Sequence, residues 1–304
     1  MQARINTLTL NPSLDYIITI DQVVLGKLNE MKDYLILAGG KGINVSLVLN
    51  NLGIDTIATG FDAGFAGKEI VRQLDEMHCK HDFVTLDEGC NRINIKLKSE
   101  QETEINATGP NINENHIQEL IKKLSIATKD DYIVLSGSVP KNLSENIYQR
   151  IMQELKSTGA KVVLDTRKKY LEYGLEMKPF LVKPNKDELE EIFGVSIETK
   201  EDIEKYAKKL QQFGAENVLV SLGKDGAMLL DSNEKVHYQD APKGKLINSV
   251  GAGDSMVAGF LAGYIQSGGN YEEAIKTGVA AGSASAFSRL LATKEEIIQI
   301  KQNI

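Results

Sequence analysis

The sequence predicts a layered α/β fold built around a mostly parallel β-sheet. From about residue 130 onward, short runs rich in β-branched residues alternate with segments of helical periodicity, which is typical of βα units. The periodicity is clearest in EDIEKYAKKLQQFG, where apolar residues recur at helical spacing until Gly214 ends the pattern. The expected strands are DYIVLSGS, AKVVLDT, FLVKPN and NVLVSLG.

Length and composition exclude several classes of protein. A chain of 304 residues with 42% apolar residues can bury a large core, and its formal charge of −7 argues against a general binder of nucleic acid or membrane surfaces. No stretch reaches about 18 consecutive apolar residues, and the N-terminal segment lacks a signal-peptide pattern, so we expect neither a membrane span nor export. Two cysteines, Cys79 and Cys90, do not make a disulfide framework, which predicts a cytoplasmic protein.

Two segments in the first hundred residues predict a small additional sheet. In NRINIKLKSEQETEIN, apolar and polar residues alternate from Arg92 to Lys98, so one face of the expected strand is apolar and the other is basic. The simpler interpretation is an antiparallel edge hairpin with solvated lysines. The alternative is a sheet that turns its polar face toward an anionic ligand. We expect one domain over residues 1–304, with a β lid formed by insertions at about 12–37 and 90–108.

The segment NSVGAGDSMVAGF predicts a helix start that binds an anion. A helix N-terminus leaves backbone N–H groups unpaired, and the small residues Gly251, Ala252 and Gly253 let a phosphate approach them closely. Asp254 follows at the mouth of this turn, where it could orient a hydroxyl group and accept its proton during phosphoryl transfer. The alternative is that Asp254 only caps the helix.

The segment AGGKGINVS, residues 38–46, is the second candidate. Its glycines permit close backbone approach, while Lys41 and Asn44 offer a charge and an amide to a polar ligand. The alternative is a tight strand-to-helix turn with its lysine in solvent. No Ser or Thr follows the lysine, and no GxGxxG pattern occurs in the chain, which argues against a P-loop and against a Rossmann dehydrogenase.

Two further segments suggest contacts with a metal and a nucleotide. In LVKPNKDELEEIFG, Asn185 and Glu188 share one face of a helix start, so their oxygen atoms could hold Mg²⁺ through water molecules. A capping box between the same two residues explains the spacing equally well. VSLGKDGAML predicts a strand, a glycine turn and a strand, which suits either a hairpin or a turn that carries a nucleotide phosphate.

Taken in order along the chain, these segments resemble the ribokinase-like (PfkB) carbohydrate kinases. GGKGINVS resembles the N-terminal signature of that family and NSVGAGDSMVAGF its C-terminal signature. TLTLNPSLDYI, LSGSVP, VKPN, VSLGKDGAML and GVAAGSASAF resemble segments between and after the signatures, whereas GFDAGFAG and SRLLATKEE depart from the family pattern. The resemblance implies a three-layer α/β sandwich with a mostly parallel central sheet, and a β-sheet lid that often mediates dimerisation.

The resemblance also implies roles for the candidate residues. The catalytic base would be Asp254, with an anion hole formed by Gly251, Ala252 and Gly253. ATP, the cosubstrate, would contact Lys183, Asn185, Ser221, Gly223 and Gly226. Mg²⁺ would be positioned by Asn185 and Glu188. The hydroxyl groups of the sugar would be held by Asp15, Gly40, Asn44 and Ser138.

The segments NPSLDYI and NSVGAGDS resemble the branch that contains 1-phosphofructokinase and tagatose-6-phosphate kinase. We therefore expect a kinase that converts a ketohexose monophosphate to a bisphosphate, with fructose 1-phosphate favoured over tagatose 6-phosphate and fructose 6-phosphate. A bound phosphate is held best by Arg or Lys, and Lys27, Lys41 and Arg92 lie where that branch places such cations. More remote alternatives are a kinase of an unphosphorylated sugar and a non-catalytic sensor of sugar phosphates.

Overall fold

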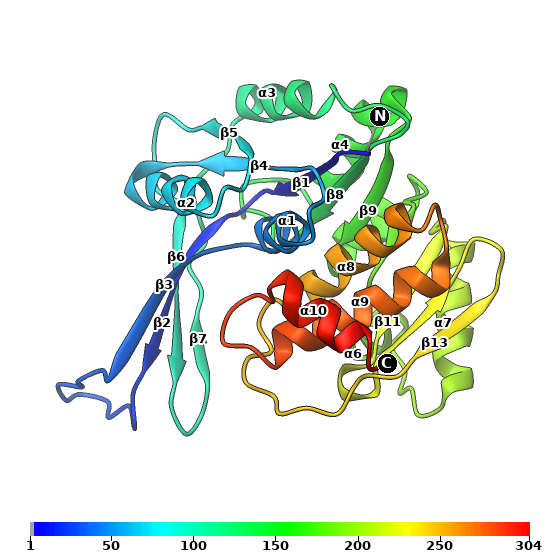
Figure 1. The fold of residues 1–304 in the computed structure, drawn as a ribbon. Coiled ribbons are helices and arrows are strands. Elements are labelled where there is room, and N and C mark those ends of the chain that lie inside the picture. Colours follow the sequence, from blue (N-terminus) through cyan, green and yellow to red (C-terminus); the bar gives the residue numbers. More distant parts are fainter. Residues whose placement is uncertain (1–2) are drawn as a thin grey trace.

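A computed structural model describes residues 3–304 and shows a three-layer α/β body from which a second, smaller sheet projects (Figure 1). The central sheet has nine strands in the order β13-β12-β11-β10-β9-β8-β1-β4-β5. The strands from β11 to β5 pair in parallel, and β12 and β13 continue the sheet antiparallel. The predicted fold class is therefore confirmed. The strands are β1 (Ile5–Thr9), β4 (Thr56–Asp62), β5 (His81–Thr85), β8 (Tyr132–Ser136), β9 (Lys161–Asp165), β10 (Leu181–Val182), β11 (Asn217–Ser221), β12 (Ala227–Leu230) and β13 (Val236–Gln239).

Helices cover both faces of this sheet, which explains why its inner strands are apolar along their whole length. In β8, Ile133 and Leu135 enter the core on one face, and Val134 enters the core on the other. The first face packs against α3 (Glu114–Leu124), α4 (Ile147–Leu155), α5 (Lys168–Leu175), α6 (Lys186–Phe193) and α7 (Lys200–Gln212). The second face packs against α1 (Lys41–Asn51), α2 (Gly64–Glu76), α8 (Ala252–Gln266), α9 (Tyr271–Ala286) and α10 (Lys294–Lys301). Of the helices between residues 3 and 304, none has both the length and the apolarity that crossing a bilayer requires.

The second sheet has the strand order β3-β2-β6-β7. It consists of β2 (Ser13–Thr19), β3 (Asp33–Gly39), β6 (Arg92–Lys98) and β7 (Thr103–Ile105). The expected antiparallel hairpin at the edge of the sheet is confirmed, because β6 pairs antiparallel with the edge strand β7. The expectation that its lysines are solvated is wrong for Lys96, because β6 also pairs in parallel with β2 on its other side. This pairing sets Asn94 beside Asp15, so the polar face of β6 meets a carboxylate, and the side chain of Lys96 is only 13% exposed.

Two side-chain amides fasten the second sheet to the body. Gln73 of α2 accepts the backbone N–H of Ala38 at 2.6 Å and donates to the carbonyl of Ile36 at 3.1 Å, as a neighbouring strand would do. Asn91, just before β6, accepts the N–H of Ala63 at 2.6 Å and donates to the carbonyl of Phe61 at 2.9 Å. The root of the sheet is therefore fixed beside β4 and α2.

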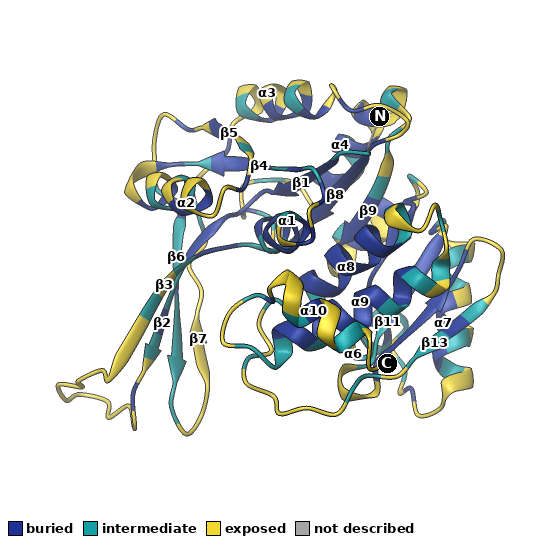
Figure 2. Cartoon of the chain, viewed as in Figure 1, coloured by how far each residue is buried: buried dark blue, intermediate teal, exposed yellow. Residues whose placement is uncertain are grey.

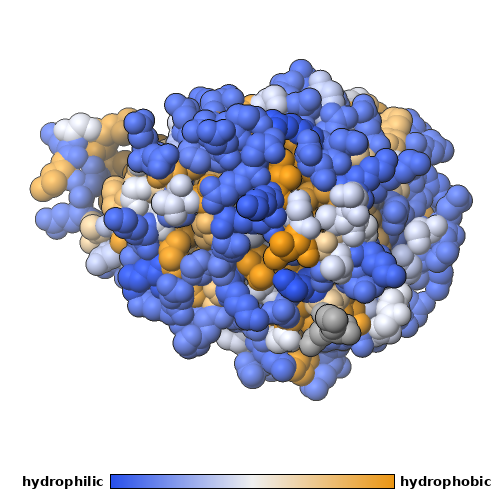
Figure 3. Space-filling model, turned by 90° about the horizontal axis from the view of Figure 1, so that it is seen from above, coloured by the Kyte–Doolittle hydropathy of each residue, from blue (hydrophilic) through white to orange (hydrophobic). Residues whose placement is uncertain are grey.

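The far end of the second sheet is exposed and carries apolar side chains (Figure 2). Leu25 and Leu28, in the connection between β2 and β3, are each 91% exposed, and Tyr34 and Ile36 of β3 are 54% and 40% exposed. The projecting end at the left of Figure 3 shows hydrophobic atoms among hydrophilic ones. This tip is the part of the sheet that a second molecule would most readily bury.

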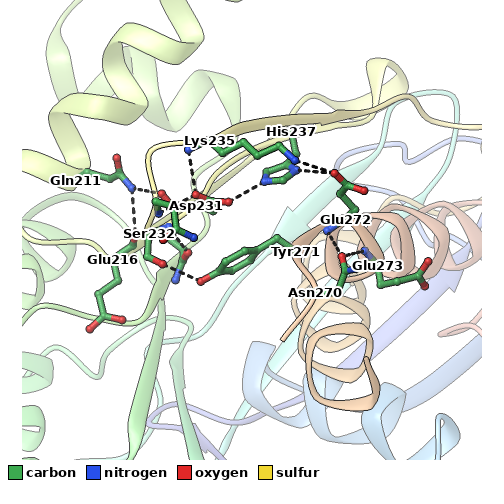
Figure 4. Close-up of polar contacts among 12 residues, drawn as sticks. Gln211, Glu216, Asp231, Ser232, Lys235, His237, Asn270, Tyr271, Glu272 and Glu273 are labelled. Atoms are coloured by element: carbon green, nitrogen blue, oxygen red, sulfur yellow. Dashed lines mark hydrogen bonds and ion pairs between the residues drawn. The ribbon is translucent and has the colours of Figure 1, made fainter. Parts of the chain in front are cut away.

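At the opposite end of the body, a buried polar cluster ties α9 to the β12–β13 hairpin (Figure 4). Asp231 accepts a hydrogen bond from Nε2 of His237 at 2.8 Å, and it also accepts the backbone N–H groups of Asn233 and Lys235. The ammonium of Lys235 pairs with Glu272 in the first turn of α9 at 2.8 Å. Burial opposes ionisation of Asp231, but these hydrogen bonds outweigh burial and hold its pKa below the ordinary value of 3.8.

Asp231→Asn is expected to lower the free energy of unfolding by about 1–3 kcal/mol at pH 7, because it removes the charge that accepts these bonds. A carboxyl group whose folded-state pKa is lowered stabilises the fold above its unfolded pKa, and this contribution is lost as pH falls through the folded value. Urea unfolding at neutral pH and between about pH 5 and pH 3 would show the wild type losing stability faster than the variant. Parallel curves would contradict this account. Asp82→Asn, which removes an exposed ion pair with Lys123, serves as the control.

Candidate active site

A row of polar residues lies across the carboxyl ends of the central strands. Thr9 of β1 pairs in register with Ser136 of β8, which pairs with Asp165 of β9, and Lys183 directly follows β10. Residues paired in register point to the same face of a sheet. Ligands of parallel α/β sheets bind at this edge, so the row forms the floor of the candidate site.

Asp165, in the middle of this row, is held between two lysines. Its Oδ1 atom accepts a hydrogen bond from Nζ of Lys41 at 3.0 Å and lies 3.6 Å from Nζ of Lys183. Burial opposes ionisation, but the two ammonium groups outweigh it and lower the pKa of Asp165. Its Oδ2 atom is buried with no hydrogen-bond partner in the described chain. The sequence analysis missed this residue, although an Asp that ends the buried strand AKVVLDT was an available signal.

Asp254 lies in the first turn of α8 and is 6% exposed. Its Oδ2 atom accepts a hydrogen bond from Nδ2 of Asn44 at 2.7 Å. Burial raises the pKa of Asp254, and the charge of Asp165 adds to this, against the opposing effects of Lys41, Asn44 and Lys183. The helix has no side-chain cap, so the alternative that Asp254 merely caps it is wrong.

The turn before Asp254 requires glycine at position 251. Gly251 is the N-cap residue of α8 with φ of +79°, and a Cβ atom there would lie 2.6 Å from Cδ2 of Leu291. A Cβ atom on Gly253 would lie 3.3 Å from Nζ of Lys183, which places that ammonium beside the first turn. The N–H of Ala252 donates to the carbonyl of Ser249 at 3.3 Å, so the N–H groups of Gly253 and Asp254, together with Lys183, make an anion-binding corner.

The GGKG turn, residues 39–42, places the start of α1 beside Asp165 and Asp254. Gly40 is the N-cap residue of α1 with φ of +126°, and a Cβ atom there would lie 2.6 Å from Cγ2 of Thr9. Gly39 is packed against the Asp15 carboxyl group. Burial opposes the charge of Lys41, but Asp165 and then Asp254 outweigh it and raise the pKa of Lys41. The alternative that this lysine points into solvent is therefore wrong.

The polar face of the second sheet supplies further groups beside Asp15. Its Oδ1 atom accepts hydrogen bonds from Ser13 at 2.7 Å and Asn94 at 2.9 Å, and its Oδ2 atom lies 3.0 Å from the ammonium of Lys96. No role had been assigned to Lys96, because the sequence does not show that β2 and β6 are neighbours. Asp15 is thus fixed in orientation by groups from both strands.

Arg92, the first residue of β6, is a half-buried cation without a counter-charge. Its Nε atom donates to the carbonyl of Asn11 at 3.1 Å, and Nη1 lies 3.5 Å from Oδ1 of Asn94. Within residues 3–304, no carboxylate forms an ion pair with it. Burial lowers the pKa of Arg92, and the charge of Asp15 only partly opposes this. An anion bound here would replace the missing counter-charge.

Asn185 and Glu188 form the capping box of α6. Oδ1 of Asn185 accepts the N–H of Glu188 at 2.7 Å, and Oε2 of Glu188 accepts the N–H of Asn185 at 2.9 Å. An isolated bridge sets Asn185 beside Ser221, the last residue of β11. The following segment is the expected hairpin, in which Gly223 and Gly226 have φ of +60° and +92°.

Two predicted substrate contacts, Ser138 and Lys27, lie at the rim of the site and outside it, respectively. Ser138 is exposed, one residue beyond Gly137, where a Cβ atom would lie 3.7 Å from Cβ of Lys41. Ser138 is therefore at the rim of the site. Lys27 is exposed in the connection between β2 and β3, past the far end of the second sheet, and the chain does not bring it to the other candidate residues (Figure 1).

Comparisons with known proteins agree over nearly the whole chain. The model of the family described as pfkB family carbohydrate kinase matches residues 8–297. The 1-phosphofructokinase of Bacillus subtilis is 45% identical over 97% of each chain. The D-tagatose-1-phosphate kinase of Bacillus licheniformis is 36% identical over 99% of this chain and 98% of its own. The crystal structure of phosphofructokinase-2 from Escherichia coli with fructose-6-phosphate is similar, with a TM-score of 0.91, 27% identity and 99% of each chain covered.

Gly251→Ala is expected to lower the free energy of unfolding by at least about 1–2 kcal/mol, because the new side chain meets a left-handed backbone as well as Leu291. Urea unfolding at neutral pH measures this loss. Gly253→Ala is the matched control in the same turn, since Gly253 is not in the left-handed region and its Cβ atom would lie 3.3 Å from Nζ of Lys183. Equal stability losses in the two variants would contradict the assignment of strain to Gly251.

Proposed function

Because the chain belongs to the pfkB family of carbohydrate kinases, we propose that it transfers the γ-phosphoryl group of ATP to fructose 1-phosphate, giving fructose 1,6-bisphosphate. Membership confirms the family and the kind of enzyme expected from the sequence, a sugar-phosphate kinase that uses ATP. The naming of the 45% identical relative as a 1-phosphofructokinase supports fructose 1-phosphate as the acceptor. We also propose that the enzyme works in the cytoplasm.

The observation that carries the choice of a phosphorylated acceptor is the unpaired cation Arg92. A neutral sugar needs no cation, whereas a half-buried guanidinium stabilises a phosphate by charge-assisted hydrogen bonds. Arg92 lies on the polar face that also presents Asp15, so one end of the sugar would bind the guanidinium while its hydroxyl groups bind the carboxylate. Gly40, Asn44 and Ser138 are proposed to complete the sugar contacts, and Lys41 to add a second cation.

Asp254 is proposed as the base that accepts the proton of the attacking hydroxyl group. Burial raises its pKa, which makes it a stronger base than an exposed Asp. The hydrogen bond from Asn44 to Oδ2 orients the carboxylate and leaves Oδ1 for the sugar. The first turn of α8 (Gly251, Ala252 and Gly253) and Lys183 would stabilise the negative charge that spreads over the transferring phosphoryl group.

The site also has the oxygen atoms that an Mg²⁺ ion would need. The buried Oδ2 atom of Asp165 has no partner within the described chain, and Asn185 and Glu188 lie at the start of α6 after the adjacent strand β10. We propose that these three residues hold Mg²⁺ through its water molecules, and that Lys183, Ser221, Gly223 and Gly226 bind the nucleotide. When bound, the ion would neutralise the phosphate oxygens of ATP.

The second sheet is proposed to act as a lid within a single domain of residues 1–304, formed by the insertions at about 12–37 and 90–108. Closure over the sugar would exclude water and so suppress hydrolysis of ATP.

The exposed side chains of Leu25 and Leu28 support the proposal that a second copy of the chain covers the tip of the lid, giving a homodimer. The same contact would enclose Lys27, which its own chain leaves in solvent.

A second candidate acceptor is tagatose 1-phosphate, since a 36% identical relative is named D-tagatose-1-phosphate kinase. It carries its phosphate on the same carbon as fructose 1-phosphate, so the two acceptors would use the same cation and differ at one hydroxyl group. Release of ADP with fructose 1-phosphate, tagatose 1-phosphate, tagatose 6-phosphate, fructose 6-phosphate and the free sugars decides among them. Turnover with free sugars but with none of the sugar phosphates would show that Arg92 does not bind a phosphate of the substrate.

Arg92→Ala is expected to raise KM for the phosphorylated acceptor about 10- to 100-fold, with a smaller change in kcat, because a charged contact is lost from the bound sugar. Steady-state kinetics with saturating Mg-ATP measures both constants. Arg72→Ala is the control, since Arg72 lies on the exposed face of α2 and pairs with Glu69 and Glu76. An unchanged KM for Arg92→Ala would exclude a phosphorylated substrate at this position.

Asp254→Asn is expected to lower kcat by about 10²- to 10⁴-fold while binding of the sugar phosphate is retained. In the wild type, kcat should fall as pH decreases through the raised pKa of Asp254, because the protonated acid cannot accept the proton. This acid limb should disappear in the variant. Equilibrium binding by calorimetry and pH–rate profiles of both proteins measure these effects. A variant that keeps full turnover would show that another group is the base.

A further inference from the structure

The Glu188 carboxylate, one of the groups proposed to face Mg²⁺, is occupied at both oxygen atoms. Oε2 accepts the backbone N–H of Asn185 at 2.9 Å within the capping box of α6. Oε1 lies 2.5 Å from Nε of Arg167. A metal ion that approaches Glu188 with its water shell therefore meets a guanidinium already paired with the outer oxygen.

The two partners of this ion pair differ in how firmly they are held. The side chain of Glu188 is 11% exposed and is anchored to the start of α6, whereas that of Arg167 is 61% exposed. Among the described residues, Arg167 forms an ion pair with Glu188 alone. Glu188 is thus the fixed member of the pair and Arg167 the movable one.

The backbone places Arg167 at the edge of the sheet where the phosphates of the substrates would bind. It follows Asp165 and Thr166 at the carboxyl end of β9 and is the N-cap residue of α5. The next residue, Lys168, has φ of +53°, a left-handed conformation that costs a residue with a side chain about 1 kcal/mol or more. Strain of this kind concentrates at functional sites, which agrees with a role for this turn in the reaction.

A hollow beside the pair gives the guanidinium room to move. It has a volume of about 190 Å³, and its lining includes Thr166, Arg167 and Glu188. The carboxylates of Glu172 and Glu191 line the same hollow. Lys168 and Lys169 line it as well, and Lys168 pairs with Glu191 at 3.2 Å, so Glu172 is the carboxylate available to Arg167 when Glu188 faces a metal ion.

We propose that Arg167 is a positioning residue that competes with a divalent cation for the Glu188 carboxylate, and so sets the metal concentration at which the site fills. The inference rests on the role of Glu188 in the proposed function. Without metal, the guanidinium neutralises Glu188. When the metal binds, like charges repel, and Arg167 turns into the hollow. Because Arg167 is exposed, the competition changes metal affinity only a few fold and weakens as salt screens it.

The test uses Mn²⁺ as the probe and the full chain in complex with a non-hydrolysable ATP analogue. Electron paramagnetic resonance of free Mn²⁺ gives its dissociation constant without any turnover. Arg167→Gln is expected to bind Mn²⁺ about two- to fivefold more tightly than the wild type. The difference should shrink as KCl rises from about 0.05 M to about 0.5 M. Arg167→Ser removes the same charge at a helix N-cap that suits serine, and it should show the same gain.

Two controls isolate the charge of Arg167. Arg167→Lys keeps the charge and is expected to stay near the wild-type dissociation constant. Lys169→Gln removes an equal charge two residues away, where Lys169 is exposed and pairs with Glu145 at 3.0 Å, and it is expected to have no effect. An equal gain in Lys169→Gln would mean that net charge alone is responsible and would overturn the inference.

Glu188→Gln distinguishes failure of this inference from failure of the proposed function. If Glu188→Gln leaves Mn²⁺ binding unchanged, Glu188 does not face the metal, and both the metal role and the competition are lost. If Glu188→Gln weakens Mn²⁺ binding but Arg167→Gln and Arg167→Ser, both folded by thermal unfolding, bind no more tightly than the wild type, only the competition is overturned.

Discussion

Asp165, Asp254 and Lys183 are buried beside the partly buried Lys41 at the carboxyl edge of the central sheet, and the rest of the structure depends on this group of charges. An ion taken out of water is destabilised by several kcal/mol unless an opposite charge or a hydrogen-bond donor compensates it. Asp165 is compensated by Lys41 and Lys183, and the charge of Lys41 also acts on Asp254. Each of these four charged groups is stabilised by the others, so the strands and helices that carry them must come together in this arrangement.

This requirement explains why two helices begin at the same place. Both α1 and α8 start on glycines in the left-handed region or beyond it, neither has a side-chain cap, and both direct their N-termini toward the row of polar residues. In these first turns the N–H of Ile43 donates to Thr9 and that of Ala252 to Ser249, and the remaining N–H groups and the two lysines create a positive corner on the body. The second sheet presents the donor Arg92 and the acceptor Asp15 on its polar face, opposite the N–H groups and lysines of the body.

The sequence predicted those parts of the fold and the site that local patterns determine. The βα alternation and the two glycine turns are readable because each requires particular residues at fixed spacing, and the candidate groups Asp254, Asn44 and Lys41 do lie together. Asp165 was missed because one Asp at a strand end resembles many others. The burial of Lys96 in the β6–β7 hairpin was not predicted, because the parallel pairing of β2 with β6 joins segments far apart in the chain and no local pattern shows that register.

The hydrogen bond from Asn44 to Asp254 joins residues 210 positions apart. Contacts of this kind form late in folding, because closing a long loop costs conformational entropy. During synthesis on the ribosome, the first two hundred residues therefore emerge with the residues proposed to face the sugar, but without the proposed base or its helix. If Asp254 is the base, a nascent or truncated chain without α8 cannot activate a hydroxyl group, and the enzyme becomes active only after its last helices have packed.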